Sequence, residues 1–127
     1  MLKTYPAIFH EEKDKSYWIE FPEFNGGTQG DNLEEAMLMA KDFLAGILAY
    51  YIEEDTPLPE PTDISTLKVD DGFTTLIQVD PSAYIKGNKT IRKNVTIPEW
   101  ISIKADKENI NYSETLTRAL TKRLNLE

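Results

Sequence analysis

The feature that most constrains this chain is a reversal of charge partway along it. Residues 1–85 hold 17 Asp and Glu residues against 5 Lys and Arg, a net charge of −12. Residues 86–127 hold 5 acidic against 9 basic residues, a net of +4, so the two parts account for the −8 of the 127-residue chain. Such asymmetry predicts two small modules with different partners, and the basic module suits a polyanion.

Composition excludes several classes of protein. The apolar content of 40% is enough for a folded core, which excludes wholesale disorder. With no cysteine and one histidine, the chain offers neither a thiolate nucleophile nor a Cys- or His-rich metal site, and we expect no enzyme, cofactor or metal. No apolar run reaches the roughly 20 residues of a membrane span and no signal-type apolar core follows the start. We therefore expect a cytoplasmic protein with no membrane partner.

The acidic part is predicted to begin with an antiparallel hairpin. Two runs rich in aromatic and branched residues, 5–10 and 17–21, flank a charged loop. Pro22 ends the second run. The glycines of residues 26–30 then indicate turns around a third strand that is very short at best.

A helix and a fourth strand complete the acidic part. Asp31 stands three residues before Glu34, a spacing typical of a helix N-terminus, and apolar residues recur at three- and four-residue steps to about Glu53. Three prolines in residues 57–61 end the helix, and residues 73–79 form the next strand. The prediction is an α+β fold, β-β-β-α-β, in which one helix covers one face of an antiparallel-rich sheet.

The basic part is predicted to be a strand followed by two helices. Residues 90–97 alternate between a mostly apolar and a polar face, as the period of two in a strand requires. Pro98 is expected in the first turn of a helix that runs to about Glu108. Asn111, with Glu114 three residues on, predicts the start of the second helix.

A module of this size cannot bury its apolar surface alone, and a lone strand leaves its backbone groups unpaired. We therefore predict a homodimer in which two copies of residues 90–97 form an antiparallel ribbon. The predicted dimerisation residues are Val95, Ile97, Trp100 and Leu116. The outer face of the ribbon carries Arg92, Asn94 and Thr96, which suit guanine, adenine and thymine in the major groove. Lys86 and Lys89, just before the ribbon, are expected as flexible phosphate contacts.

Both parts of the chain resemble one known family. The run 94–101, then Ala105, residues 108–113 and Leu116, resembles the ribbon-helix-helix module of HicB antitoxins. The front part is similar to that family's other domain in the hairpin residues 17–22, in 27–31 and in the helix opening 33–36. The resemblance covers nearly the whole chain.

The resemblance implies a division of labour. Residues 1–85 would form a partial RNase H-like domain that binds the small RNA-cleaving toxin HicA. Residues 86–127 would form a DNA-binding module, dimeric or of higher order, that represses the shared operon. By position, Arg92, Asn94 and Thr96 match the base-reading residues, and Asn111 and Ser113 lie at the helix N-terminus that matches the phosphate clamp.

Two other functions stay open at this point. A ribbon-helix-helix regulator could sense a small ligand through its front domain; unlike an antitoxin, it would have no adjoining gene for a short, basic, histidine-containing protein. A degenerate nuclease would need carboxylates that converge on metal ions, and the candidates Glu20, Asp70, Asp71 and Asp80 lie mostly at strand ends or turns. His10, with no nucleophile motif around it, is expected to be a structural residue of an edge strand.

Overall fold

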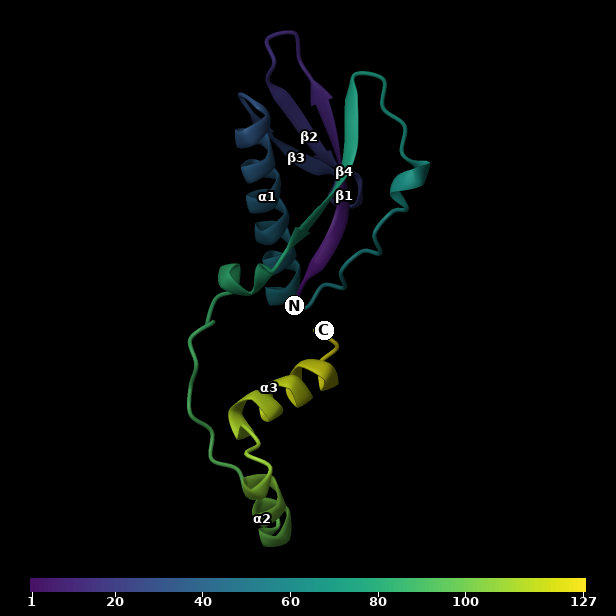
Figure 1. The fold of residues 1–127 in the computed structure, drawn as a ribbon. Helices are drawn as coiled ribbons and strands as arrows, with labels where there is room; N and C mark the ends of the chain where they lie inside the picture. The colour runs from purple at the N-terminus through teal and green to yellow at the C-terminus, as the bar shows by residue number, and fades with distance from the viewer. The chain divides into compact units, whose positions relative to one another are not determined.

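A computed structural model describes residues 1–127 and divides them into two compact units, Met1–Asn88 and Lys89–Glu127. The first unit is a four-stranded antiparallel sheet with one long helix (Figure 1). Its strands and helix are β1 (Lys3–Glu11), β2 (Tyr17–Phe21), β3 (Gly26–Gly30), α1 (Leu33–Glu53) and β4 (Gly72–Val79), with short 3-10 turns η1 (Pro22–Phe24), η2 (Ile64–Thr66) and η3 (Pro81–Tyr84). The predicted order β-β-β-α-β is confirmed. None of the helices is long and apolar enough to cross a membrane.

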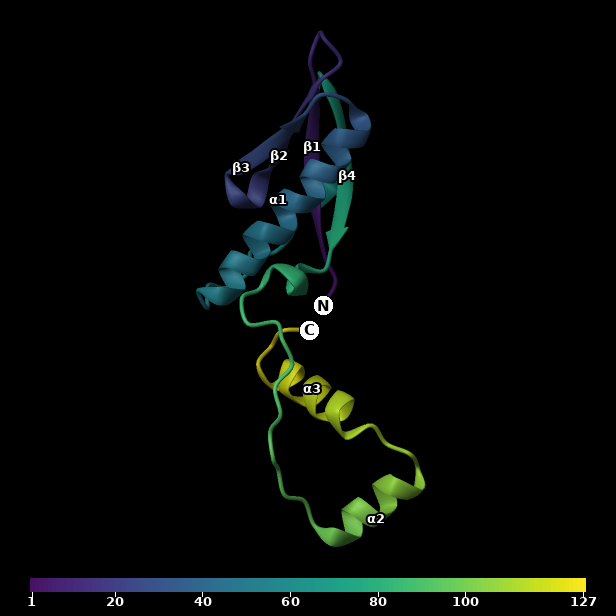
Figure 2. The ribbon, with the colours of Figure 1, turned by 90° about the vertical axis from the view of Figure 1, so that its left-hand side faces the viewer.

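The sheet has the strand order β3-β2-β1-β4, and all neighbours are antiparallel. Strand β1 is internal: residues 8–11 pair with β2, and residues 3–10 pair with β4. Helix α1 lies on one face of the sheet, and the segment of residues 54–71 runs along the other side (Figures 1 and 2). That segment is fastened to the sheet by the Tyr5 hydroxyl, which donates to the carbonyl oxygen of Pro59 at 2.6 Å.

The core lies between α1 and the sheet. Phe9, Ile19 and Phe21 from the sheet and Leu44 and Leu48 from α1 are fully buried. The apolar stripe predicted for the helix is the face that packs there, because positions three and four residues apart share one side of a helix. All the buried apolar residues of the chain belong to this first unit.

Two local predictions in the first unit are corrected. Residues 26–30, expected as turns around a third strand that is very short at best, form a full five-residue strand, β3, which pairs with β2 from Tyr17↔Gly30 to Phe21↔Gly26. The N-cap of α1 is Asn32, one residue after Asp31, because its Oδ1 accepts the N–H of Glu35 at 2.9 Å.

The second unit contains α2 (Glu99–Lys107) and α3 (Tyr112–Arg123). The cap predicted at Asn111 is confirmed, since its Oδ1 accepts the N–H of Glu114 at 3.0 Å. Pro98 is the N-cap of α2 and not a first-turn residue: its ψ is 140°, and its carbonyl accepts the N–H groups of Ile101 and Ser102. Residues 90–97 have no regular secondary structure, whereas a strand was predicted. The physical reason is that a strand needs a neighbour, and a single chain supplies none here.

Candidate functional site

The second unit has no buried residue. The four predicted dimerisation residues are all exposed in the single chain, Val95 and Trp100 by 65% and 63%. The other large apolar residues of this unit that are exposed are Ile91, Ile101, Ile103, Ile110, Tyr112, Leu120 and Leu124. An apolar surface of this extent on a small unit indicates an interaction site, because the unit gains little from burial by itself.

One side chain of the second unit, Tyr112, makes polar contacts between its two helices. The Tyr112 hydroxyl at the start of α3 donates to Asp106 Oδ1 on α2 at 2.5 Å and lies 3.3 Å from the Ser102 carbonyl oxygen. The bond to Asp106 raises the pKa of Tyr112. On α3, Arg118 pairs with Glu114 at 2.7 Å. The Tyr112 hydroxyl thus links α3 to α2, whereas the Arg118–Glu114 pair lies within α3, and the large apolar side chains of both helices stay exposed.

The residues predicted to contact DNA occupy three different settings. Arg92, Asn94, Thr96 and Lys89 are exposed along the irregular segment before α2. Lys86 belongs to the first unit, where its backbone N–H donates to Glu53 Oε1 at 2.8 Å, so its main chain is anchored.

Asn111 and Ser113 lie at the start of α3. The Asn111 side chain is occupied by capping, which leaves the exposed Ser113 hydroxyl and the other first-turn N–H groups for an anion.

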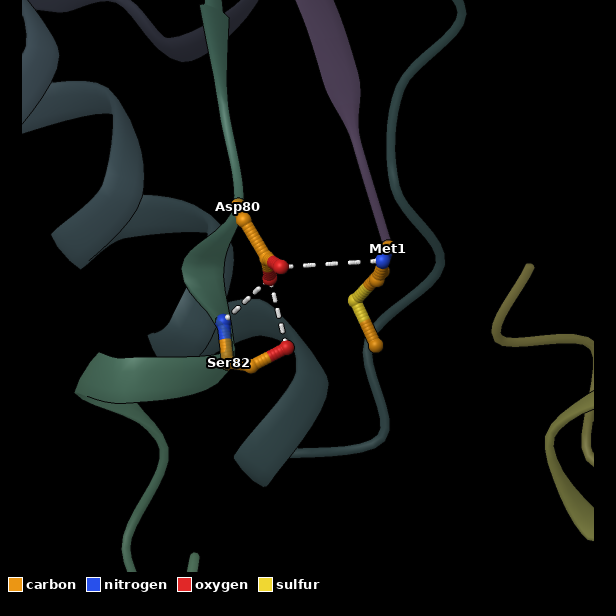
Figure 3. A network of polar contacts seen from close by, with 3 residues as sticks. All are labelled: Met1, Asp80 and Ser82. Carbon is orange, nitrogen blue, oxygen red and sulfur yellow. Dashed lines mark hydrogen bonds and ion pairs between the residues drawn. The ribbon is translucent and has the colours of Figure 1, made fainter. Parts of the chain in front are cut away.

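The segment that follows β4 is fastened to α1. Asp80 accepts hydrogen bonds from the Ser82 N–H at 2.9 Å and the Ser82 hydroxyl at 2.5 Å, and it lies 3.7 Å from the Met1 amine (Figure 3). The Tyr84 hydroxyl donates to Asp42 of α1 at 2.6 Å, which raises the pKa of Tyr84. A groove of about 570 Å³ lies beside these contacts, lined by α1, the end of β4 and Tyr84. The first unit therefore holds the chain up to the start of the basic segment.

The hydrogen bonds to Asp80 predict a lowered pKa for this carboxyl group, which can be measured. The hydroxyl and the backbone N–H of Ser82 donate hydrogen bonds to Asp80 and lower its pKa. The contribution of these bonds to the free energy of unfolding is therefore present when Asp80 is ionised and is lost as the pH falls through the lowered pKa. Ser82→Ala removes the hydroxyl bond, and we expect the pKa of Asp80 to rise toward its ordinary value in a carboxyl NMR titration. Ser65→Ala is the matched control, because it should shift only Asp63, whose pKa is lowered in the same way. An unchanged Asp80 titration in Ser82→Ala would contradict the assignment.

Two of the four nuclease candidates, Asp71 and Glu20, lie against His10. His10 Nδ1 lies 2.7 Å from Asp71 Oδ1, and its Nε2 lies 3.6 Å from Glu20 Oε2. Asp80 is engaged with Ser82. The expectation that His10 sits on an edge strand is wrong, because β1 is internal to the sheet. No group of three or more His, Cys, Asp and Glu side chains is placed to hold a metal ion.

Comparison with known proteins identifies the family. A family model described as HicB_like antitoxin of bacterial toxin-antitoxin system matches residues 5–123, so the chain belongs to that family of antitoxins. Antitoxin HicB 1 of Photorhabdus laumondii is 33% identical over 67 residues, which are 52% of this chain and 43% of that relative. The match thus spans less than half of the relative's length.

Solved structures are similar over nearly the whole chain. A chain of a toxin-antitoxin complex from Streptococcus pneumoniae is 32% identical, with a TM-score of 0.63, over 97% of this chain and 99% of that one. The antitoxin HicB of Burkholderia pseudomallei shares the fold at 20% identity, with a TM-score of 0.60 over 96% of this chain and 98% of that one. The resemblance to HicB antitoxins expected from the sequence is confirmed.

Proposed function

We propose that the first unit binds and neutralises a small RNA-cleaving toxin of the HicA type, and that the second unit dimerises and binds operator DNA. The observation that carries the proposal is the likeness to a chain of a toxin-antitoxin complex along the length of both units. We place the functional boundary after residue 85, close to the division of the two units after Asn88. A partial RNase H-like classification of the first unit belongs to the same proposal.

Charge supports the toxin as the partner of the first unit. A toxin that binds RNA needs a positively charged surface, and residues 1–85 carry a net charge of −12. Complementary charge speeds encounter, and a bound antitoxin blocks access to the same surface. The test is co-expression with the product of the adjoining short reading frame. The pair should co-purify, RNA cleavage should stop, and the complex should form more slowly as salt is raised.

Exposure supports dimerisation of the second unit. Pairing residues 90–97 with those of a second copy would satisfy backbone groups and cover Val95, Ile97, Trp100 and Leu116, all now exposed. The ribbon would join two copies of the chain in a homodimer, and such dimers could assemble further. Its other face would present Arg92, Asn94 and Thr96, and the start of α3 would supply N–H groups to a phosphate.

Base reading and phosphate contact are separable on this surface. Asn94→Ala should cost about 1–3 kcal/mol on operator DNA and much less on a scrambled duplex, because an amide that reads adenine carries no charge. Lys89→Ala should weaken binding to both duplexes alike and lower the salt slope by about one unit. Gel-shift titrations of both variants at two salt concentrations measure these effects. Equal losses on the two duplexes for Asn94→Ala would leave an electrostatic tail without sequence readout.

A further inference from the structure

Strand β4 is an edge of the sheet, and its free side is defined by its register with β1. The N–H of Glu11 donates to the carbonyl of Asp71 at 2.7 Å, and Pro6, which has no N–H, lies opposite Leu76. Opposed residues in an antiparallel pair alternate between bonded and non-bonded pairs. Odd-numbered residues therefore bond to β1, and the backbone groups of the even-numbered residues point outward. The outward set is Gly72, Thr74, Leu76 and Gln78.

No backbone hydrogen bond outside the sheet satisfies these outward groups. The eight residues of β4 contain no charge and no proline, although natural edge strands are normally protected by such residues. The opposite edge, β3, is shorter and glycine-rich, and it packs closely against α1 at Gly30. Leu76 is 54% exposed on β4, so apolar surface accompanies the free backbone groups. The edge has the properties of a strand-addition site.

Charge at the ends of β4 selects the occupant. A second copy paired antiparallel so that all four outward residues are used would set Gly72 opposite Gln78 and Thr74 opposite Leu76. That register places Asp70 opposite Asp80 of the other copy, at both ends of the pair. Like charges directly opposite destabilise paired strands. A strand with an uncharged middle and Lys or Arg at its ends would instead meet carboxylates at both ends.

We propose that the free edge of β4 accepts an extended segment of a basic partner polypeptide as a fifth strand, and that this partner is the toxin. The inference rests on the proposed function, and it names the surface through which neutralisation begins. Main-chain bonds to the outward residues supply the affinity, while Asp70 and Asp80 favour the basic partner over self-pairing.

Thr74→Pro in the full chain tests the edge. The outward N–H of Thr74 is not used by β1, so proline removes one donor for the partner and keeps the ladder inside the sheet. Thr74→Ala is the matched control, because it removes the same side chain and retains the N–H. Affinity for the product of the adjoining toxin reading frame should fall about tenfold or more in Thr74→Pro and about twofold or less in Thr74→Ala. Equal losses in the two variants, or no loss in Thr74→Pro, would overturn the proposal.

Hydrogen exchange of the unaltered protein keeps the test independent of how the proline variant folds. In the toxin complex the amides of Gly72, Thr74, Leu76 and Gln78 should exchange at least about tenfold more slowly than in the free antitoxin. If the toxin is inhibited and these amides stay unprotected, the proposed function stands and the strand-addition proposal fails. If the protein neither binds nor inhibits the toxin, both fail. Protection of these amides by the antitoxin alone at high concentration would show self-pairing and overturn the choice of occupant.

Discussion

A chain that ends at Asn88 should fold, bind the toxin and fail completely to bind operator DNA or to form the ribbon dimer. The reason lies in the distribution of burial: every buried apolar residue lies in the first unit, and the second unit has none. The first unit therefore loses no core contact when residues 89–127 are removed. The shortened chain also keeps Lys86 and the contact of its N–H with Glu53.

Circular dichroism measures folding, light scattering measures the dimer, gel shifts measure operator binding, and co-purification measures toxin binding. The matched control is the full chain with Trp100→Ala and Leu116→Ala, which truncates two of the exposed apolar side chains and keeps every cation of the basic unit. It should weaken the dimer and, through it, operator binding, while toxin binding stays unchanged. Operator binding by the chain that ends at Asn88 would refute the assignment of DNA contact to the basic unit.

Much of the first unit follows from sequence periodicity. The apolar residues of 33–53 recur at helical spacing, and they form the buried face of α1, because a helix on a sheet is stable only if that stripe is covered. The runs 5–10 and 17–21 are β-rich, and they pair as β1 and β2. Local sequence pattern is enough to predict whether a segment forms a helix or a strand and which of its faces is buried.

Long-range pairing explains what the sequence could not predict. Periodicity does not reveal which strand lies at the edge, so the sequence predicts an edge strand at His10 although β1 pairs on both sides. The anchoring of Lys86 depends on Glu53, which is 33 residues away in the sequence. The strand proposed for residues 90–97 would need a second chain to pair with, so the alternating pattern can indicate it although the single chain has no strand there.

The candidate surfaces were predictable to different degrees. Charge and alternation were enough to single out Arg92, Asn94 and Thr96, and these residues are exposed in the structure. The composition of the chain does not predict the free edge of β4, because exposed backbone groups depend on the topology and register of the sheet. The close approach of β3 to α1 could not be predicted either, since glycine serves both in tight turns and where two backbones lie close together.

That close approach leads to the second large effect, Gly30→Ala. A Cβ at Gly30 would lie 2.5 Å from the backbone nitrogen and 2.6 Å from the Cα of Ala36, so β3 and the first turn of α1 must move apart. We expect a loss of about 1–3 kcal/mol in the free energy of unfolding, because overpacking against backbone is not relieved by a rotamer change. The prediction follows from β3 being a strand under the helix and not a turn.

Gly46→Ala is the matched control for this change, with the opposite expected sign. A Cβ at Gly46, in the middle of α1, would meet nothing within 4 Å, so the same substitution should stabilise the unit by about 0.5–1 kcal/mol through helix propensity. Urea unfolding of the chain that ends at Asn88 measures both values, with Trp18 as its single tryptophan. Destabilisation of similar size by both substitutions would point to a general intolerance of α1. A neutral Gly30→Ala would show that β3 does not press on the first turn of α1 as the structure places it.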